Sequence, residues 1–245
     1  FHPVREQTLD IMDKKGTKPG QSDRISEILF AISRDRTRTN LLRNQEQRAI
    51  AWLVQRIPER ITSDMLSGLG LSGSLVVFTG FMLASFFDRA FLLLGPVGFT
   101  LSWFGDSLDG RLAYYRNKPR KNYGFVLDIT LDWIGIILIG CGFIVYAESF
   151  WELLGYGFIV MYGWEMIIAL MRYRITGEYS IDSGKFSPTE ARILISFILI
   201  LEVILAGSVN YSAMFAVVIL FTINIADTRK LLRTADSVDN KDKKP

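Results

Sequence analysis

The stretch Asp106–Asp132 reads DSLDGRLAYYRNKPRKNYGFVLDITLD and connects two long apolar runs, Ala90–Phe104 and Ile134–Tyr146. It carries two pairs of aspartates, with members three residues apart in the first pair and four apart in the second. On a helix, residues at these spacings lie on one face. A carboxylate at the boundary of a membrane costs free energy unless it has a partner. We therefore expect both pairs to share a common partner. The four carboxylates are Asp106, Asp109, Asp128 and Asp132.

The chemistry of this stretch favours a hard cation as that partner. All four donors are carboxylates, and the only histidine and the only cysteine, His2 and Cys141, lie outside the stretch. Such oxygen ligands suit Mg²⁺, Mn²⁺ or Ca²⁺ rather than zinc. Two converging pairs can hold two divalent ions about 3.5–4 Å apart, the arrangement that clamps a transferring phosphoryl group. A carboxylate left partly free can accept a proton from an attacking hydroxyl.

Two glycines distinguish this stretch from a collar, that is, a ring of solvated charged residues at the membrane surface. The alternative is that the acids merely pair with the Arg and Lys residues of the segment 111–121. Such a collar does not need glycine at fixed offsets, whereas Gly110 directly follows one aspartate and Gly124 lies four residues before another. Glycine lets backbone or substrate come close where any Cβ would intrude. The pattern therefore favours a binding site over a collar.

Charge and hydrophobicity are segregated along the chain. Of its 245 residues, 49% are hydrophobic and 22% are charged, and the mean hydropathy is +0.24. Residues 1–63 are polar with 12 Lys and Arg, whereas residues 64–227 consist of apolar runs separated by short charged clusters. This segregation predicts a cytosolic leader followed by an all-α integral membrane domain. We expect the lipid bilayer as a partner and no nucleic acid.

Six apolar segments are long enough to cross a hydrocarbon core of ~30 Å. Their orientation follows from the basic residues, because Lys and Arg concentrate in cytoplasmic loops. Of the 28 Lys and Arg, all except Arg89 fall within or at the edge of segments on one side. Both termini, the loops 111–123 and 172–189, and the four aspartates are therefore predicted to face the cytoplasm, with the protein in the cell membrane. The predicted spans are 64–87, 90–108, 124–147, 152–171, 190–208 and 212–227.

The leader is predicted to end in one amphipathic helix. In Leu41–Arg60, apolar residues recur at helical spacing, with Trp52 close by and Arg elsewhere on the surface. This pattern is typical of a helix lying on the inner leaflet. The alternative is a soluble helix that caps the membrane domain. The predicted organisation is a polar leader of disordered character at 1–40, an amphipathic interfacial helix at 41–63, a six-helix membrane domain at 64–232 and a charged cytosolic tail at 233–245.

The same residues resemble the signature of the CDP-alcohol phosphotransferases, also called CDP-alcohol phosphatidyltransferases. That signature reads D-x2-D-G-x2-A-R, then eight or nine residues, then G-x3-D-x3-D. The Arg expected after Ala113 is Tyr114 here, which removes one expected phosphate contact. Arg116, two positions further on, is our candidate to reach the same space. The matching residues are Asp106, Asp109, Gly110, Ala113, Gly124, Asp128 and Asp132.

The resemblance implies a reaction and roles for these residues. Members transfer a substituted phosphate group from a CDP-linked donor to an alcohol hydroxyl and release CMP. It implies six membrane helices around a polar cavity, a homodimer, and two divalent cations, Mg²⁺ or Mn²⁺, held by the four aspartates. Asp132 would also be the catalytic general base. The predicted nucleotide-binding residues are Gly110, Ala113, Arg116 and Gly124.

A second basic cluster points to the acceptor alcohol. The segment Gly184–Arg192 reads GKFSPTEAR and resembles a stretch found in some bacterial members of this family. Pro188 and the following Glu suit a helix N-terminus, which itself favours anions. Ordinary positive-inside charge is the alternative. These residues favour CDP-diacylglycerol with a polar acceptor over a CDP-aminoalcohol. The candidate acceptor-binding or phosphate-binding residues are Lys185, Arg192, Arg172 and Arg174.

Two other functions stay open on the sequence. A cation transporter or channel predicts acids near the bilayer midplane and often an internal repeat. Three polar residues, Glu165, Glu202 and Asn224, lie in or near the predicted spans. The two acids either line an alcohol pocket or bond neighbouring helices. A catalytically degenerate family member is suggested by Tyr114. Clustering of the aspartates at one boundary, and the presence of all four, favour the transferase.

Overall fold

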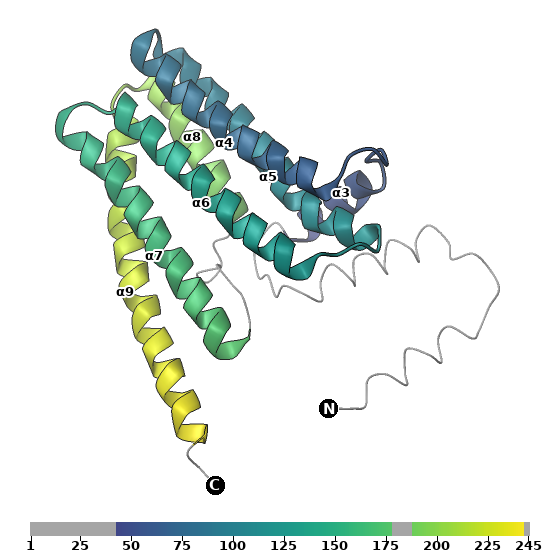
Figure 1. Ribbon diagram of the computed structural model, residues 1–245. Coiled ribbons are helices and arrows are strands. Elements are labelled where there is room, and N and C mark those ends of the chain that lie inside the picture. Colours follow the sequence, from purple (N-terminus) through teal and green to yellow (C-terminus); the bar gives the residue numbers. More distant parts are fainter. Residues whose placement is uncertain (1–42, 178–187, 243–245) are drawn as a thin grey trace.

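The computed structural model describes residues 43–177 and 188–242, and within these ranges every regular element is a helix (Figure 1). The predicted leader 1–40 and Lys185 lie outside the described residues. Two short 3₁₀ helices, η1 (Arg89–Leu93) and η2 (Ser149–Trp151), occupy turns. The α-helices are α3 (Arg43–Val54), α4 (Ser63–Phe86), α5 (Leu94–Tyr115), α6 (Lys121–Tyr146), α7 (Glu152–Thr176), α8 (Pro188–Ile204) and α9 (Ser208–Asp242).

Six of these helices pack in a closed circuit that does not follow chain order. Helix α4 packs on α5 and α6, and α7 packs on α6 and α9. Helix α8 closes the circuit because it packs between α5 and α9 (Figure 1). The circuit therefore runs α4, α5, α8, α9, α7, α6 and back to α4, and it brings the signature helices α5 and α6 into one bundle with α8.

The closest pair in this circuit is α4 and α5, whose backbones touch through glycines. A Cβ added at Gly73, Gly98 or Gly105 would lie under 3.0 Å from backbone atoms of the partner helix. Small residues allow such close approach between membrane helices, where no hydrophobic effect drives association. The pair therefore holds the C-terminal half of α5, with its two aspartates, against α4.

The connection between α5 and α6 is short, which places the two aspartate pairs on adjacent helix ends. Only residues 116–120 separate the two helices. Asn117 adopts a left-handed backbone with φ of 55°, a conformation that asparagine tolerates better than most residues. Lys118 then donates its N–H to the carbonyl of Ala113 at 2.9 Å, which closes the end of α5. This turn reverses the chain within five residues.

Five of the six predicted spans are helices long and apolar enough to cross a membrane, judged by length and composition over the described residues. They belong to α4, η1–α5, α6, η2–α7 and α9. Helix α8 has 17 residues, or about 25 Å at 1.5 Å per residue, so helix length alone does not establish the sixth span. Helix α9 continues well past the predicted end at 227 and carries the charged segment to Asp242 as helix.

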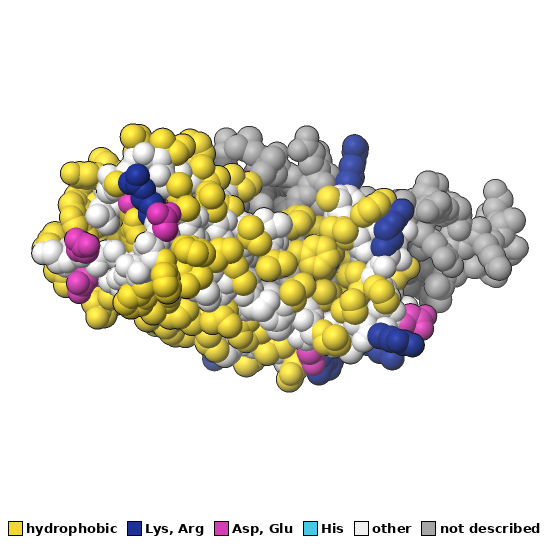
Figure 2. Space-filling view, turned by 90° about the horizontal axis from the view of Figure 1, so that it is seen from above, with side chains coloured by type: hydrophobic (Ala, Val, Ile, Leu, Met, Phe, Trp, Pro, Cys, Tyr) yellow, Lys and Arg dark blue, Asp and Glu magenta, His cyan; other side chains and the backbone are white. Residues whose placement is uncertain are grey.

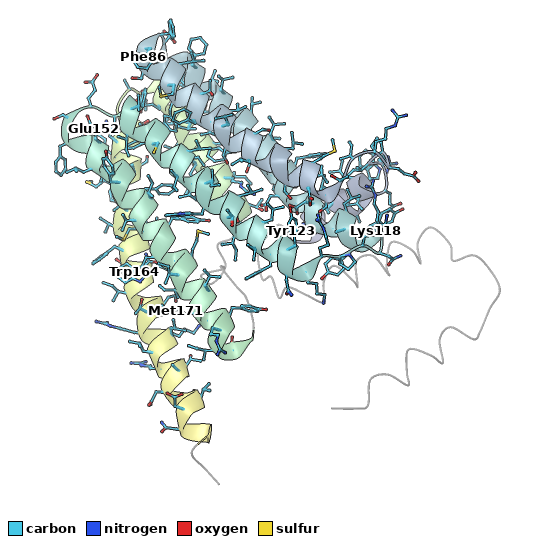
Figure 3. The ribbon with its side chains drawn as sticks, viewed as in Figure 1. Phe86, Lys118, Tyr123, Glu152, Trp164 and Met171 are labelled. Carbon is cyan, nitrogen blue, oxygen red and sulfur yellow. The ribbon has the colours of Figure 1, made fainter. Side chains whose placement is uncertain are left out.

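The outer surface agrees with a membrane location. Large apolar side chains such as Phe86, Phe197 and Phe215 are exposed. Apolar side chains cover much of the face seen in Figure 2, whereas charged side chains occur in small groups. Contiguous apolar surface of this kind marks contact with lipid or another protein. Figure 3 shows Lys118 and Tyr123 at one end of the bundle and Phe86 and Glu152 at the other, so the turns alternate between two ends.

Helix α3 is shorter than the predicted amphipathic helix, and its apolar side chains are buried in protein. Ile50 and Val54 are fully buried in one cluster with Leu66 of α4 and with Leu108 and Leu112 of α5. This packing fits the alternative of a helix that caps the membrane domain. Trp52 is 54% exposed with the Arg56 guanidinium 3.7 Å from its ring centroid. Contact of this outer face with the inner leaflet stays a prediction.

The buried Glu202 of α8 bonds neighbouring helices. The Glu202 carboxylate accepts hydrogen bonds from the N–H groups of Gly207 and Val209, both at 2.8 Å, and from the hydroxyls of Ser208 at 3.0 Å and Tyr146 at 2.9 Å. It therefore satisfies the free N–H groups at the start of α9. Of the two predicted alternatives, lining an alcohol pocket or bonding neighbouring helices, the second holds for Glu202, because these hydrogen bonds join it to α6 and to the start of α9.

Cysteine labelling tests the topology. We expect Ser149→Cys and Ser237→Cys, each in a Cys141→Ala background, to react with a membrane-impermeant maleimide from opposite sides. Both residues are exposed; Ser149 lies in η2, between α6 and α7, and Ser237 lies near the C-terminal end of α9. Figure 1 shows the α6–α7 connection and the C-terminal end of α9 at opposite ends of the described helices. Reaction of both from the same side in sealed vesicles would contradict the three crossings, by α7, α8 and α9, that the predicted topology places between the two positions.

Candidate functional site

Three of the four predicted aspartates converge where α5 and α6 face each other. Asp106 of α5 and Asp128 and Asp132 of α6 each offer a carboxylate oxygen, and these oxygens all lie within 4.8 Å of one another. All three side chains are partly exposed. Three hard oxygen donors at this separation fit Mg²⁺ or Mn²⁺. The two halves of the signature, separated by 21 residues of chain between Asp106 and Asp128, therefore meet at one candidate cation site.

Asp109 lies beside this group and is held by α4. The Ser67 hydroxyl donates to Asp109 Oδ2 at 2.6 Å, and the Gly110 N–H donates to Asp109 Oδ1. The Ser63 hydroxyl donates to the Asp109 backbone carbonyl at 2.7 Å. Asp109 is not one of the three carboxylates whose oxygens lie within 4.8 Å of one another. Its predicted role as a metal ligand stays a prediction.

Arg192 reaches the aspartates from a third helix, α8. Its guanidinium donates to Asp106 Oδ2 at 2.9 Å, and the side chain is only 17% exposed. Arg192 lies in the first turns of α8, which packs on α5. Of the four basic residues predicted to bind a phosphate or acceptor, it is the one whose ion pair joins it directly to the aspartate group among the described residues.

Two of the other predicted basic residues lie near the C-terminal end of α7. Arg172 forms an ion pair with Asp227 of α9 at 3.5 Å. Arg174 is exposed in the last turn of α7, and Lys185 is outside the described residues. Their predicted contacts with an acceptor therefore remain predictions.

Tyr162 of α7 is a site neighbour that the sequence prediction missed. It interacts electrostatically with Asp132, Arg192 and Asp106. Its position follows from the packing of α7 on α6, since a Cβ at the adjacent Gly163 would touch the Trp133 ring. No sequence motif includes Tyr162, and its spacing does not distinguish it from the other aromatic residues of α7. Only the contact between α6 and α7 brings it to the aspartates.

The two signature glycines face open space, unlike the packing glycines of α4 and α5. A Cβ added at Gly110 or Gly124 would meet no atom within 4 Å. Both residues lie inside helices, where glycine costs about 1 kcal/mol relative to alanine. Helix packing therefore does not explain these glycines, and their predicted role in nucleotide binding stays a prediction.

Arg116 is engaged by the linker between α3 and α4. Its guanidinium donates to the carbonyl oxygens of Pro58 at 2.8 Å and Ile57 at 3.3 Å, and also to Ile61. These bonds satisfy backbone groups of the turn that leads into α4. The predicted contact of Arg116 with a phosphate stays a prediction, and the structure gives this side chain a structural role that the sequence prediction did not include. The predicted nucleotide-contact Ala113 lies half-buried in the last turn of α5.

A second arginine of the same loop also binds α4. Arg120 forms an ion pair with Asp64, and the two side chains are 53% and 44% exposed. The hydrogen bond with Asp64 raises the pKa of Arg120. An exposed pair of this kind contributes little to stability. It nevertheless lies beside the Arg116 bonds, so the loop between the two aspartate pairs contacts the start of α4 at two points.

The fold and the site together define a membrane protein with several spanning helices and a carboxylate-lined candidate cation site at one end of its bundle. The family model for CDP-alcohol phosphatidyltransferase matches residues 61–225, well over half of the chain. The chain therefore belongs to the CDP-alcohol phosphatidyltransferase family, whose members transfer phosphate-containing groups. No individual curated protein matches the chain.

Substitution of the open glycines separates ligand binding from packing. We expect Gly110→Ala to leave the thermal midpoint unchanged or slightly raised, because alanine is the better helix former and the space is open. The KM for a CDP-linked donor should rise about tenfold, or ~1.4 kcal/mol. Measurement of KM and thermal unfolding in detergent tests both parts.

Gly105→Ala is the matched control for that experiment. Its Cβ would contact the backbone of Leu66 and Gly70, so overpacking should destabilise the bundle by about 1–3 kcal/mol. A loss of stability in Gly110→Ala as large as in Gly105→Ala would show that Gly110 is a packing residue instead.

Proposed function

We propose that the protein transfers a substituted phosphate group from CDP-diacylglycerol to the hydroxyl of a polar alcohol, with release of CMP. The convergence of Asp106, Asp128 and Asp132 within 4.8 Å carries this proposal. Membership of the family supports a CDP-alcohol donor and an alcohol acceptor. Arg192 beside Asp106 adds a cation for the anionic part of a substrate. CDP-diacylglycerol is assigned as the donor because of the basic residues Lys185, before α8 in the sequence, and Arg192, within it.

Two divalent cations, Mg²⁺ or Mn²⁺, belong to this proposal. Asp106, Asp128 and Asp132 would hold them, with Asp109 as the fourth ligand. The donor set fits because it consists of carboxylate oxygens from two helices. When bound, the ions neutralise the negative charge of the diphosphate.

The chemical step needs a base, a nucleophile and a leaving group. Asp132 accepts the proton of the acceptor hydroxyl. The hydroxyl oxygen attacks the phosphorus that carries the lipid, a new P–O bond forms, and the P–O bond to the CMP phosphate breaks. The electron pair of that bond leaves with CMP. Positioning of both substrates at one site supplies the remaining rate enhancement, and no covalent enzyme intermediate is required.

The proposal includes a sixth span formed by α8. Helices α7 and α9 run in the same direction, because Met161 pairs with Asn224 and Arg172 pairs with Asp227. The chain must therefore return to the other end of the bundle between them. Helix α8 is the described helix in that interval, and it packs between α5 and α9 (Figure 1). Six spans place both termini on the cytoplasmic side of the cell membrane, where a cytosolic acceptor arrives. A homodimer also belongs to the proposal, by family membership.

The contacts of the remaining acids favour a transferase over a cation transporter. Glu202 is held by groups at the start of α9 and by Tyr146, so its carboxylate is part of the scaffold. Glu165 lies buried on α7 and interacts electrostatically with Asp227 and Arg172. The candidate cation site is instead at the ends of α5 and α6, as a cytosolic substrate requires.

Asp132→Asn tests the assigned base. We expect turnover to fall by about 10²–10⁴-fold, because that is the usual contribution of a general base. Binding of the CDP-linked donor should stay close to the wild-type value, since the remaining aspartates still bind a cation. Radiolabelled CMP release measures turnover, and calorimetry with Mg²⁺ present measures binding.

Asp109→Asn is the comparison, and it should weaken cation and nucleotide binding together. Near-normal turnover in Asp132→Asn would show that another group takes the proton. The donor assignment is tested in the same assay with CDP-diacylglycerol and CDP-choline. CMP release from CDP-choline but not from CDP-diacylglycerol would show that the donor is a CDP-aminoalcohol and that the acceptor is the lipid.

A further inference from the structure

Ser67 occupies a position from which it can set the orientation of a signature carboxylate. Its hydroxyl lies 2.6 Å from Asp109 Oδ2, and the side chain is buried. The hydroxyl also lies 3.3 Å from the Ser63 carbonyl, one helical turn before it. A hydroxyl has one proton to donate, and a hydrogen bond to a carboxylate is shorter and stronger than one to a neutral carbonyl. The bond to Asp109 is therefore the dominant one.

The close packing of α4 on α5 makes this contact possible. A Cβ at Gly105 would touch the backbone of Leu66 and Gly70, the residues on either side of Ser67 in the same two turns of α4. A serine side chain is short, so it reaches a carboxylate on another helix only where the two backbones are this near. The same approach lets Ser63 bond the Asp109 carbonyl at 2.7 Å.

Both oxygens of Asp109 are thus held by the protein. Ser67 donates to Oδ2 and the Gly110 N–H donates to Oδ1. The two bonds together fix the plane of the carboxylate.

We infer that Ser67 is a positioning residue for the transfer reaction, which holds the Asp109 carboxylate in the orientation needed to bind a divalent cation and the diphosphate of the donor. The inference rests on the proposed function. Groups that hydrogen-bond to a metal ligand orient it, and their loss typically costs 10–100-fold in metal affinity or activity. Ser67 lies outside the signature and comes from a different helix.

Ser67→Ala tests this inference by cation binding in the absence of substrate. Mn²⁺ titration of the purified protein, followed by electron paramagnetic resonance, should show about tenfold weaker binding than in the wild type. Ser67→Thr keeps the hydroxyl and should restore most of the affinity. The KM for the CDP-linked donor should rise in Ser67→Ala, with a smaller change in kcat.

Ser72→Ala is the matched control on the same helix. The Ser72 hydroxyl donates only to the Leu69 carbonyl at 2.7 Å within α4, among the bonds that the structure describes. This variant removes the same hydroxyl from the same helix and should bind Mn²⁺ like the wild type. Thermal unfolding of both variants shows whether either has lost its fold.

A second pair of variants keeps the test decisive if Ser67→Ala is unstable. In an Asp109→Ala background, Ser67→Ala should change Mn²⁺ affinity no further, because the carboxylate that it positions is gone. An equal loss in both backgrounds would overturn the inference and leave a packing role. Wild-type Mn²⁺ affinity in folded Ser67→Ala would overturn it as well, while CMP release by the wild type would leave the proposed function standing. A wild type that neither binds Mn²⁺ nor releases CMP would overturn both.

Discussion

Backbone contact between α4 and α5 is the constraint on which the rest of the site depends. Glycines at Gly73, Gly98 and Gly105 let the two helices approach until a single added methyl group would collide with the opposite backbone. This packing is rigid because interlocked backbones have no rotamers to change. It fixes the position of α5 along α4, and the short turn of residues 116–120 then holds the start of α6 beside the end of α5. The two aspartate pairs meet because the helix contact is close and the turn is short.

Much of this arrangement is readable from the sequence because the signals are local. Hydropathy locates the spans, and the spacing of Asp128 and Asp132 places both on one face of α6. Thr62 accepts from the Met65 N–H at 3.2 Å as the N-cap of α4, and threonine is a common N-cap residue. The convergence of the two pairs was predicted from position alone, since short connections leave adjacent helix ends few alternatives. Three of the four carboxylates meet that expectation.

The remaining features depend on contacts between residues far apart in the chain, which spacing does not reveal. Arg192 was predicted as a phosphate ligand, but its ion pair with Asp106 follows from the insertion of α8 between α5 and α9. Arg116 was predicted from proximity to the motif, whereas its partners are carbonyls of the α3–α4 linker. The apolar face of α3 predicted lipid contact because a protein surface and a membrane surface select the same residues. Tyr162 carries no sequence signal and depends on the packing of α7 on α6.

The order of the circuit has a consequence for how the protein matures during synthesis. The helices with the aspartates leave the ribosome early, and they can pair as soon as α6 follows α5. The helix with Arg192 comes later, and α9, its other neighbour in the circuit, comes last. A nascent chain with four inserted helices thus has its acidic cluster without the arginine that pairs with Asp106. The bundle is complete only when α8 packs on α5 and α9 then packs on α8 and α7, so a chain that stalls before α8 lacks the Arg192 cation beside its aspartates.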